Sequence, residues 1–164
     1  MMRVSPSGIA LIHRFESCRL EAYMDSANIW TIGWGTTRYF GGSRVKEGDK
    51  RTQEEVDRYF AFDLHRFEDE IDMLTVDGLD QVQFDALVSF GYNVGTGQLG
   101  YRGSTLRKRV NANPLDPDIR IQFMRWHKAG GKPVYGLWRR RHAEADHYFG
   151  VETIEPPFQR GADD

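Results

Sequence analysis

The sequence is short of cysteine: Cys18 is the only one among 164 residues. An intramolecular disulfide is therefore excluded, and so is a metal site built from several thiolates. Long apolar runs are also missing. Near the N-terminus the run from Gly8 to Ile12 is followed at once by His13 and Arg14, which leaves it too short for a signal-peptide core or a membrane span. We expect a protein that is made and kept in a cytoplasm and has no stable membrane insertion.

Internal repeats, interdomain linkers and Cys/His metal spacings are absent too, so we expect one domain over residues 1–164 with no metal and no cofactor. This length is enough to bury a hydrophobic core, and 40% hydrophobic and 28% charged residues are typical of a globular protein. After Gly150 the sequence VETIEPPFQRGADD loses periodicity and gains proline and acids. We predict a loose C-terminal tail over 151–164.

Charge is distributed unevenly along the chain, although the net charge is only −2. Between residues 102 and 141 there are eleven Lys and Arg against two Asp. Such a stretch favours an anionic polymer, either nucleic acid or bacterial envelope, unless it is simply the solvated face of helices. Because no nucleic-acid-binding motif is present, we expect no nucleic acid among the partners.

The first half of the sequence predicts a helix, a small sheet and a long helix. Ser5 and Pro6 suit a helix start, and the apolar residues that follow at helical spacing place Glu16 at the C-terminal end. Aromatic and β-branched residues between 22 and 42, punctuated by glycines, are typical of an antiparallel sheet. A capping box at Thr52 begins an amphipathic helix of about six turns. We expect its charged face to be solvated and to carry no site.

The second half predicts helices only. Asp80 and Gln83 form a second capping signal for a core helix that stops at the glycines of GYNVGTG. A short helix is expected after Ser104, and a last one after Gly136. Between these two, a helix is expected to start at Asp116-Pro117, to pack through Ile121, Met124 and Trp126, and to close at Gly130-Gly131.

Two carboxyls and a hydroxyl occupy the segment FESCRLEAYMDSANIWTIGWG: Glu16, Asp25 and Thr31, on three differently shaped predicted elements. Glycoside hydrolysis needs one carboxylic acid that gives its proton to the leaving oxygen and a second group that manages water or the sugar cation. Different surroundings can separate the pKa values of two carboxyls so that each takes one role. Such a pair is also common on protein surfaces, so spacing alone does not establish catalysis.

The order E-x8-D-x5-T, within the frame FE-x-CRL-x-AY-x-D followed by TIG-x-G, resembles the catalytic segment of the phage-type lysozymes, the endolysin muramidases. The resemblance implies that Glu16 protonates the β-1,4 bond between N-acetylmuramic acid and N-acetylglucosamine in peptidoglycan. Asp25 would orient water or stabilise the sugar cation, and the Thr31 hydroxyl would hold that water. The stereochemical outcome cannot be read from spacing along the chain, and the resemblance leans toward inversion.

The resemblance also suggests sugar contacts. Tyr92 and Asn93 match an aromatic-polar-x-Gly signature of the family, and Thr36 and Thr37 follow the TIG-x-G segment. Helix termination alone would equally explain Tyr92 and Asn93. Many family members have histidine where Thr36 stands, which puts fine specificity and stability in question more than chemistry.

The C-terminal phrase RWHKAGGKPVYGLWRRRHAEADHYF resembles the W-x-x-AGG to GL-x-x-RR-x-x-E segment of many phage lysozymes. Within it Arg140 and Arg141 precede Glu144 by four and three residues, so these side chains can form an internal salt-bridge set. Substrate contact is the alternative role.

From this resemblance we expect an α+β fold of two lobes with the active-site cleft between them. The small sheet lobe would cover roughly residues 15–60, and the helical lobe roughly 61–150 together with the first helix. We expect a monomer that acts from the host cytoplasm on the cell wall, once a separate holin has permeabilised the membrane. Lytic transglycosylase activity, chitinase activity and non-catalytic glycan binding are the alternatives.

Overall fold

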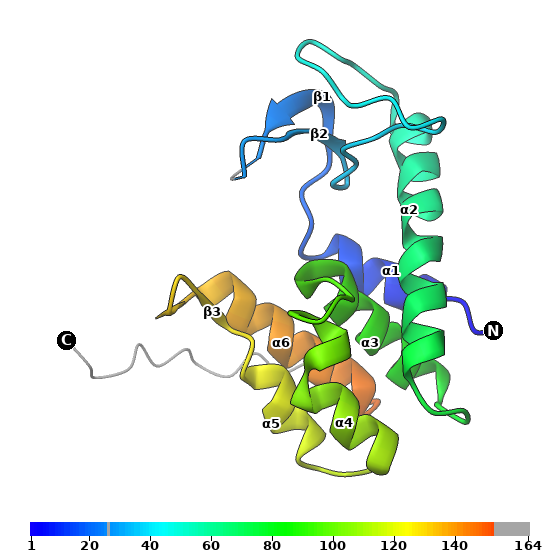
Figure 1. Cartoon of the computed structure of the whole chain (residues 1–164), viewed down its shortest axis with the longest axis vertical. Coiled ribbons are helices and arrows are strands. Elements are labelled where there is room, and N and C mark those ends of the chain that lie inside the picture. The colour runs from blue at the N-terminus through cyan, green and yellow to red at the C-terminus, as the bar shows by residue number, and fades with distance from the viewer. Residues whose placement is uncertain (26, 153–164) are drawn as a thin grey trace.

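The computed structural model describes residues 1–25 and 27–152, and it has the predicted α+β class. A two-stranded sheet lies at one end of the molecule and a bundle of helices at the other, with α2 extending along one side of both (Figure 1). In chain order the elements are α1 Pro6–His13, β1 Arg19–Met24, β2 Trp30–Gly33, α2 Gln53–Leu74, α3 Gln81–Val94, the 3-10 turn η1 Tyr101–Gly103, α4 Thr105–Ala112, α5 Ile119–Met124, β3 Lys128–Ala129, β4 Lys132–Pro133 and α6 Tyr135–Tyr148.

Helix α1 begins as predicted but ends earlier. The Ser5 side chain accepts a hydrogen bond from the backbone N–H of Gly8, and Pro6 occupies the first turn, where its missing N–H is not needed. The helix ends at His13, so Glu16 lies in the turn beyond it. The N–H of Glu16 still donates to the carbonyl of Ile12 at 3.2 Å. The turn that carries the carboxyl is thereby fixed to the helix.

The small lobe consists of β1, β2 and the loop that leads to α2. The two strands pair antiparallel with Tyr23 opposite Thr31, and the register shifts between Arg19 and Tyr23. A separate apolar core forms beneath them from Ile32, Val45 and Val56. Gly33 has φ +62, and a Cβ atom there would lie 2.7 Å from the Cβ of Val56, so only glycine lets β2 approach α2 this closely.

Helix α2 joins the lobes because it contributes to both cores. Its capping box is present as predicted, with the Thr52 hydroxyl on the N–H of Glu55 and the Glu55 carboxylate on the N–H of Thr52. Val56, near its start, packs in the small core. Phe60, Leu64 and Ile71 pack in the large core of the helical lobe.

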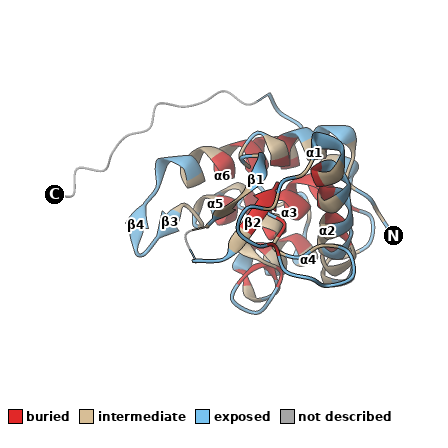
Figure 2. Ribbon diagram, turned by 90° about the horizontal axis from the view of Figure 1, so that it is seen from above, coloured by how far each residue is buried: buried red, intermediate tan, exposed pale blue. Residues whose placement is uncertain are grey.

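Helix α3 is the centre of the helical lobe, as its apolar sequence predicts. Every residue from Gln83 to Gly91 is buried, and the ribbon of this helix is largely in the buried colour in Figure 2. The capping box formed by Asp80 and Gln83 is also present. Because α3 is enclosed on all sides, its last residues reach the boundary between the lobes in a fixed position.

The expectation for residues 116–131 was wrong in two respects. Helix α5 ends at Met124, and Ile121 is 57% exposed whereas Ile119 and Phe123 are buried. Gly130 and Gly131, with φ of +56 and +79, form the turn between β3 and β4 instead of closing a helix. Two residues with positive φ fit a two-residue hairpin, so the glycine pair was assigned to the wrong type of turn. The predicted tail lies outside the described residues beyond Glu152.

Candidate active site

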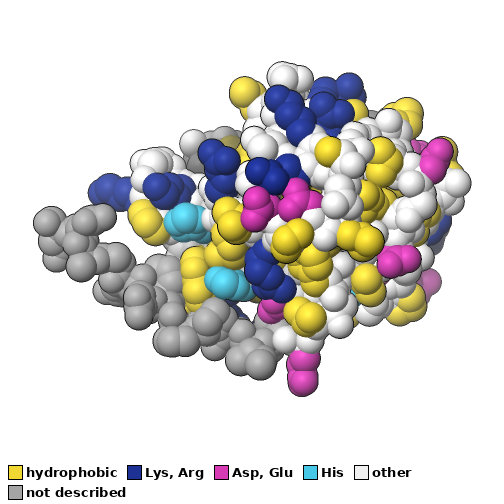
Figure 3. Space-filling view, turned by 90° about the horizontal axis from the view of Figure 1, so that it is seen from below, with side chains coloured by type: hydrophobic (Ala, Val, Ile, Leu, Met, Phe, Trp, Pro, Cys, Tyr) yellow, Lys and Arg dark blue, Asp and Glu magenta, His cyan; other side chains and the backbone are white. Residues whose placement is uncertain are grey.

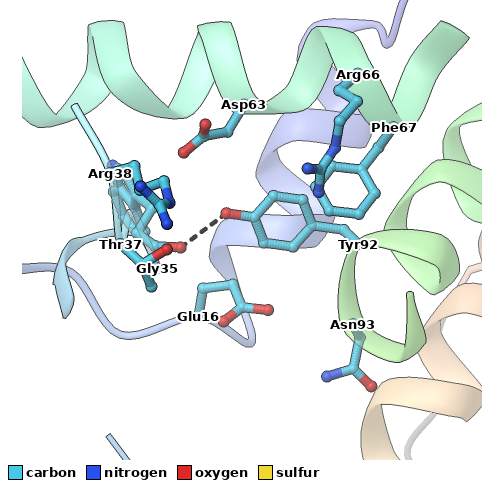
Figure 4. A pocket seen from close by; sticks show the side chains of 10 residues that line it. Glu16, Gly35, Thr37, Arg38, Asp63, Arg66, Phe67, Tyr92 and Asn93 are labelled. Carbon is cyan, nitrogen blue, oxygen red and sulfur yellow. Dashed lines mark hydrogen bonds between the residues drawn. The ribbon is translucent and has the colours of Figure 1, made fainter. Parts of the chain in front are cut away.

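A cavity of about 380 Å³ lies where the two lobes meet. Its walls come from the turn after α1, the loop after β2, the middle of α2 and the end of α3 (Figure 4). The lining residues are Glu16, Trp34, Gly35, Thr37, Arg38, Asp63, Arg66, Phe67, Tyr92 and Asn93. Figure 4 shows Glu16 and Tyr92 beside one another, with Asp63 on α2 above them. The wall thus combines two carboxyls, two guanidiniums and several rings.

Glu16 is held in this cavity by a residue from the far end of the chain. Nη1 of Arg140 lies 2.5 Å from Oε1 of Glu16. Arg140 is 3% exposed, and its Nε also binds Glu144 at 3.0 Å while its Nη2 donates to the carbonyl of Ser89 at 3.1 Å. These buried contacts fix the guanidinium, so Arg140 sets the position of the carboxyl that it touches.

Glu144 is the charge partner of both Arg140 and Arg141 in α6, as the sequence predicted. It is fully buried, accepts from Ser89 at 2.8 Å and lies 2.9 Å from Nε of Arg141. Arg141 in turn donates to Oδ1 of Asn93 at 3.0 Å. The salt-bridge set therefore extends to two residues of the cavity wall, Glu16 and Asn93.

Asp25 and Thr31 are brought together by the β1–β2 hairpin. Oδ1 of Asp25 accepts from the backbone N–H groups of Ala27 at 2.8 Å and Ile29 at 2.9 Å. The Thr31 hydroxyl donates to the carbonyl of Ile29 at 3.0 Å and lies 3.5 Å from Oδ2 of Asp25. Neither residue is among those that line the 380 Å³ cavity.

The charges of Asp25 and Glu16 both influence the pKa of Tyr23. Burial raises the pKa of Tyr23, and the negative charges of Asp25 and Glu16 raise it further against the opposite effect of Arg19. Both carboxyls therefore act on the same phenol. Tyr23 lies opposite Thr31 across the two strands.

Among the predicted sugar contacts, Thr37, Tyr92 and Asn93 line the cavity. The Tyr92 hydroxyl donates to the carbonyl of Trp34 at 2.8 Å, and burial raises its pKa, with a further contribution from the charges of Glu16 and Asp63. Thr36 is 2% exposed, and its hydroxyl donates to Oδ2 of Asp63 at 3.0 Å. Thr36 thus reaches the cavity only through Asp63, and a direct sugar contact by Thr36 stays a prediction.

The expectation that the charged face of α2 carries no site is wrong. Asp63, Arg66 and Phe67 line the cavity, and burial raises the pKa of Asp63. Positions 63, 66 and 67 lie on one side of a helix, next to the apolar stripe. The sequence signal was the position of Asp63 and Arg66 next to the apolar stripe of the helix. From the sequence alone we interpreted these residues as part of a solvated surface.

Other kinds of site find little support in the described part of the chain. No group of three or more His, Cys, Asp or Glu there could hold a metal ion, and none of its helices has the length and hydropathy to cross a membrane. The basic residues of the second half are partly paired, as Arg109 is with Asp116 and Arg120 with Asp146. Figure 3 shows Lys and Arg in several groups with acidic side chains between them.

Comparisons with known proteins agree with one another. The family model described as phage lysozyme matches residues 13–144. The endolysin of Bacillus phage B103 is 39% identical over 145 residues, which cover 87% of this chain and 52% of that protein. The endolysin of Salmonella phage P22 is 37% identical over 145 residues, covering 88% and 97%. The solved endolysin of Escherichia coli O157:H7 phage FAHEc1 superimposes with a TM-score of 0.81 at 37% identity, covering 95% and 98%.

Proposed function

Because the chain belongs to the phage lysozyme family, we propose that it is an endolysin muramidase. Its substrate would be bacterial peptidoglycan, and its reaction hydrolysis of the β-1,4 bond between N-acetylmuramic acid and N-acetylglucosamine. The observation that carries this proposal is the position of Glu16 on the wall of the cavity between the lobes, beside rings and guanidiniums that suit a sugar polymer.

Glu16 is the proposed general acid. Arg140 binds Oε1 and fixes the carboxyl, while Oε2 has no hydrogen-bond partner among the described residues. Oε2 is therefore the atom that can carry the proton to the glycosidic oxygen. Glu144 carries one negative charge against the two buried guanidiniums of Arg140 and Arg141, and Glu16 is the second carboxyl that contacts this pair.

Asp25 is the proposed partner for water or for the sugar cation, and Thr31 the hydroxyl that aligns the water. Two backbone N–H groups hold Oδ1 of Asp25, so Oδ2 faces Thr31 and remains available to a ligand. A threonine hydroxyl can donate and accept at once, which a water-aligning group needs. An inverting enzyme would hold that water between carboxyls about 6.5 to 9.5 Å apart.

A lytic transglycosylase is the second candidate, because Asp25 and Thr31 do not line the same cavity as Glu16. Such an enzyme cuts the same bond with one catalytic acid and leaves an anhydro product. Mass spectrometry of digested peptidoglycan separates the two reactions: hydrolysis adds water and leaves a reducing end, and transglycosylation does not.

Replacing Glu16 by Gln tests the proposal. Glutamine keeps an oxygen for Arg140 but has no acidic proton, so we expect the fold to persist and the lytic rate on permeabilised Gram-negative cells to fall at least about a hundredfold. Glu21→Gln, at an exposed position on β1, is the matched control and should lyse like the unaltered protein. A folded Glu16→Gln protein that lyses at the original rate would remove the assignment.

The remaining expectations belong to the same proposal. The protein would act as a monomer, and a separate holin would open its path from the host cytoplasm to the cell wall. The two lobes would correspond to roughly 15–60 and 61–150, with α1 in the larger one.

A further inference from the structure

A second cavity of about 330 Å³ adjoins the first on the small lobe. Thr37 and Arg38 line both, so the two hollows lie on either side of the loop after β2. The second one is lined by Asn28, Ile29, Trp30, Thr37, Arg38, Arg44 and Val45. None of the roles proposed for Glu16, Asp25 and Thr31 makes use of it.

Two arginines face one another on the wall of this cavity. Arg38 and Arg44 are partners in an isolated antiparallel bridge. Side chains directly opposite in such a bridge lie on the same side with Cβ atoms about 4.5 to 5.5 Å apart, and like charges placed in this way repel. Nη1 of Arg38 donates to the carbonyl of Gly42 at 3.0 Å, which keeps this guanidinium near the turn.

The positive charge of this pair has no acidic partner among the described residues that line the cavity. In the described ranges no Asp or Glu lines the cavity, and no ion pair joins either arginine to an acid. The other walls are the indole of Trp30 and the aliphatic side chains of Ile29 and buried Val45, together with the polar Asn28 and Thr37. The cavity therefore combines paired positive charge with apolar surface, which suits an anionic group attached to a larger organic molecule.

We propose that this second cavity binds a carboxylate carried by a substituent of the glycan strand whose backbone occupies the first cavity. The inference rests on the proposed function. In peptidoglycan the lactyl group of muramic acid bears either a free carboxyl or a peptide that ends in carboxylates. A guanidinium presents parallel N–H donors that match the two oxygens of a carboxylate, and two of them facing each other can hold one from both sides.

The test uses Arg44→Gln, since Arg44 lines only the second cavity. Three substrates are compared: native peptidoglycan, peptidoglycan whose carboxyls have been converted to amides, and glycan strands freed of peptides by an amidase, which exposes lactyl carboxyls. For the unaltered protein we expect a half-saturating concentration about fivefold lower on native than on amidated material. Arg44→Gln should lose this difference, with its maximal rate within about twofold of the original.

Two controls make the result specific. Arg102→Gln removes the same charge from an exposed position of the helical lobe and should leave the preference intact. Arg44→Lys keeps the charge without the planar fork and should restore only part of it. If peptide-free strands keep the low half-saturating concentration seen with native peptidoglycan, the bound group is the lactyl carboxyl. If the concentration rises to the value for amidated material, the bound group is a peptide carboxylate. Both results support the site.

The proposal is overturned if amidation leaves the half-saturating concentration of the unaltered protein unchanged, or if Arg44→Gln and Arg102→Gln behave alike. Failure of the proposed function gives a different result, namely no cleavage of any of the three substrates. Cosedimentation of the protein with native and amidated sacculi would then still decide on the carboxylate site.

Discussion

Asp63 is a carboxyl that lines the candidate active site and has a hydroxyl as its direct partner. Thr36 donates to it, Arg66 contributes a more distant positive charge, and burial raises its pKa above the ordinary value. The family resemblance implies a histidine at position 36, where Thr36 instead presents a hydroxyl to the Asp63 carboxyl. The presence of threonine at position 36 therefore changes the surroundings of Asp63 more than those of Glu16.

The raised pKa of Asp63 predicts how stability depends on pH. The ordinary pKa of an Asp carboxyl is about 4, and below this pH the Asp63 carboxyl is mostly protonated in both the folded and the unfolded chain. As pH rises through that value, the unfolded chain loses the proton more readily, so the free energy of unfolding falls until the folded-state pKa is passed. Asp63→Asn keeps an oxygen for Thr36 without a charge. It should have a higher Tm than the original at pH 7 and the same Tm near pH 3.

Thermal unfolding followed by circular dichroism at the two pH values measures this effect. Asp77→Asn, in the exposed loop between α2 and α3, is the matched control and should not change the pH dependence. Equal Tm values for Asp63→Asn and the original protein at pH 7 would contradict the prediction.

At the scale of single elements, the start of α2 depends on one side-chain exchange. The Thr52 hydroxyl accepts from the N–H of Glu55 at 3.2 Å, and the Glu55 carboxylate accepts from the N–H of Thr52 at 2.8 Å. Thr52→Ala removes the first of these bonds and should lower the free energy of unfolding in urea by about 1 kcal/mol. Thr105→Ala, at the exposed first residue of α4, where Ser104 and not Thr105 provides the cap, should change it far less. Equal losses would mean that the cap contributes nothing specific.

Elements with such local signals could be predicted from sequence. Capping boxes at Thr52 and Asp80 gave α2 and α3, because caps and apolar periodicity act within a few residues. The hairpin of β3 and β4 could not be predicted in this way, since two glycines suit a helix end and a tight turn equally. Which face of α5 is buried depends on its packing against α6, which the helical spacing within α5 alone does not reveal.

The site shows the same division. A motif confined to sixteen residues predicted Glu16, Asp25 and Thr31, of which Glu16 lines the cavity, and helical spacing predicted the set around Glu144. Asp63, Arg66 and Phe67 were missed because only the approach of α2 to the loop after β2 makes them part of the cavity. The contact between Arg140 and Glu16 joins positions 124 residues apart, which no local pattern reveals.

At the scale of the whole molecule, α2 couples two apolar cores. Ile32 is fully buried in the small core, where Val56 of α2 packs, and the rest of the helix belongs to the large core. Ile32→Ala should lower the free energy of unfolding by about 2 to 5 kcal/mol. Because one continuous helix enters both cores, we expect the lobes to lose stability together.

Urea unfolding followed by two signals checks this coupling. Far-UV circular dichroism reports mainly the helical lobe, and tryptophan fluorescence includes Trp30, which packs against the small core, and Trp34, which packs against both cores. Both transitions should shift to lower urea by the same amount in Ile32→Ala. Leu20→Ala, at an exposed position on β1, should leave them in place. A fluorescence transition that precedes the loss of helix would show that the small lobe unfolds alone.

The ion pair between Glu16 and Arg140 has a consequence for the order of events during synthesis. A ribosome delivers the acid early and its guanidinium partner only after most of the chain has emerged. An incomplete or clipped polypeptide that lacks α6 has nothing to fix the carboxyl in place. If Glu16 is the general acid that we propose, its carboxyl takes its final position only when translation is nearly finished and α6 has docked.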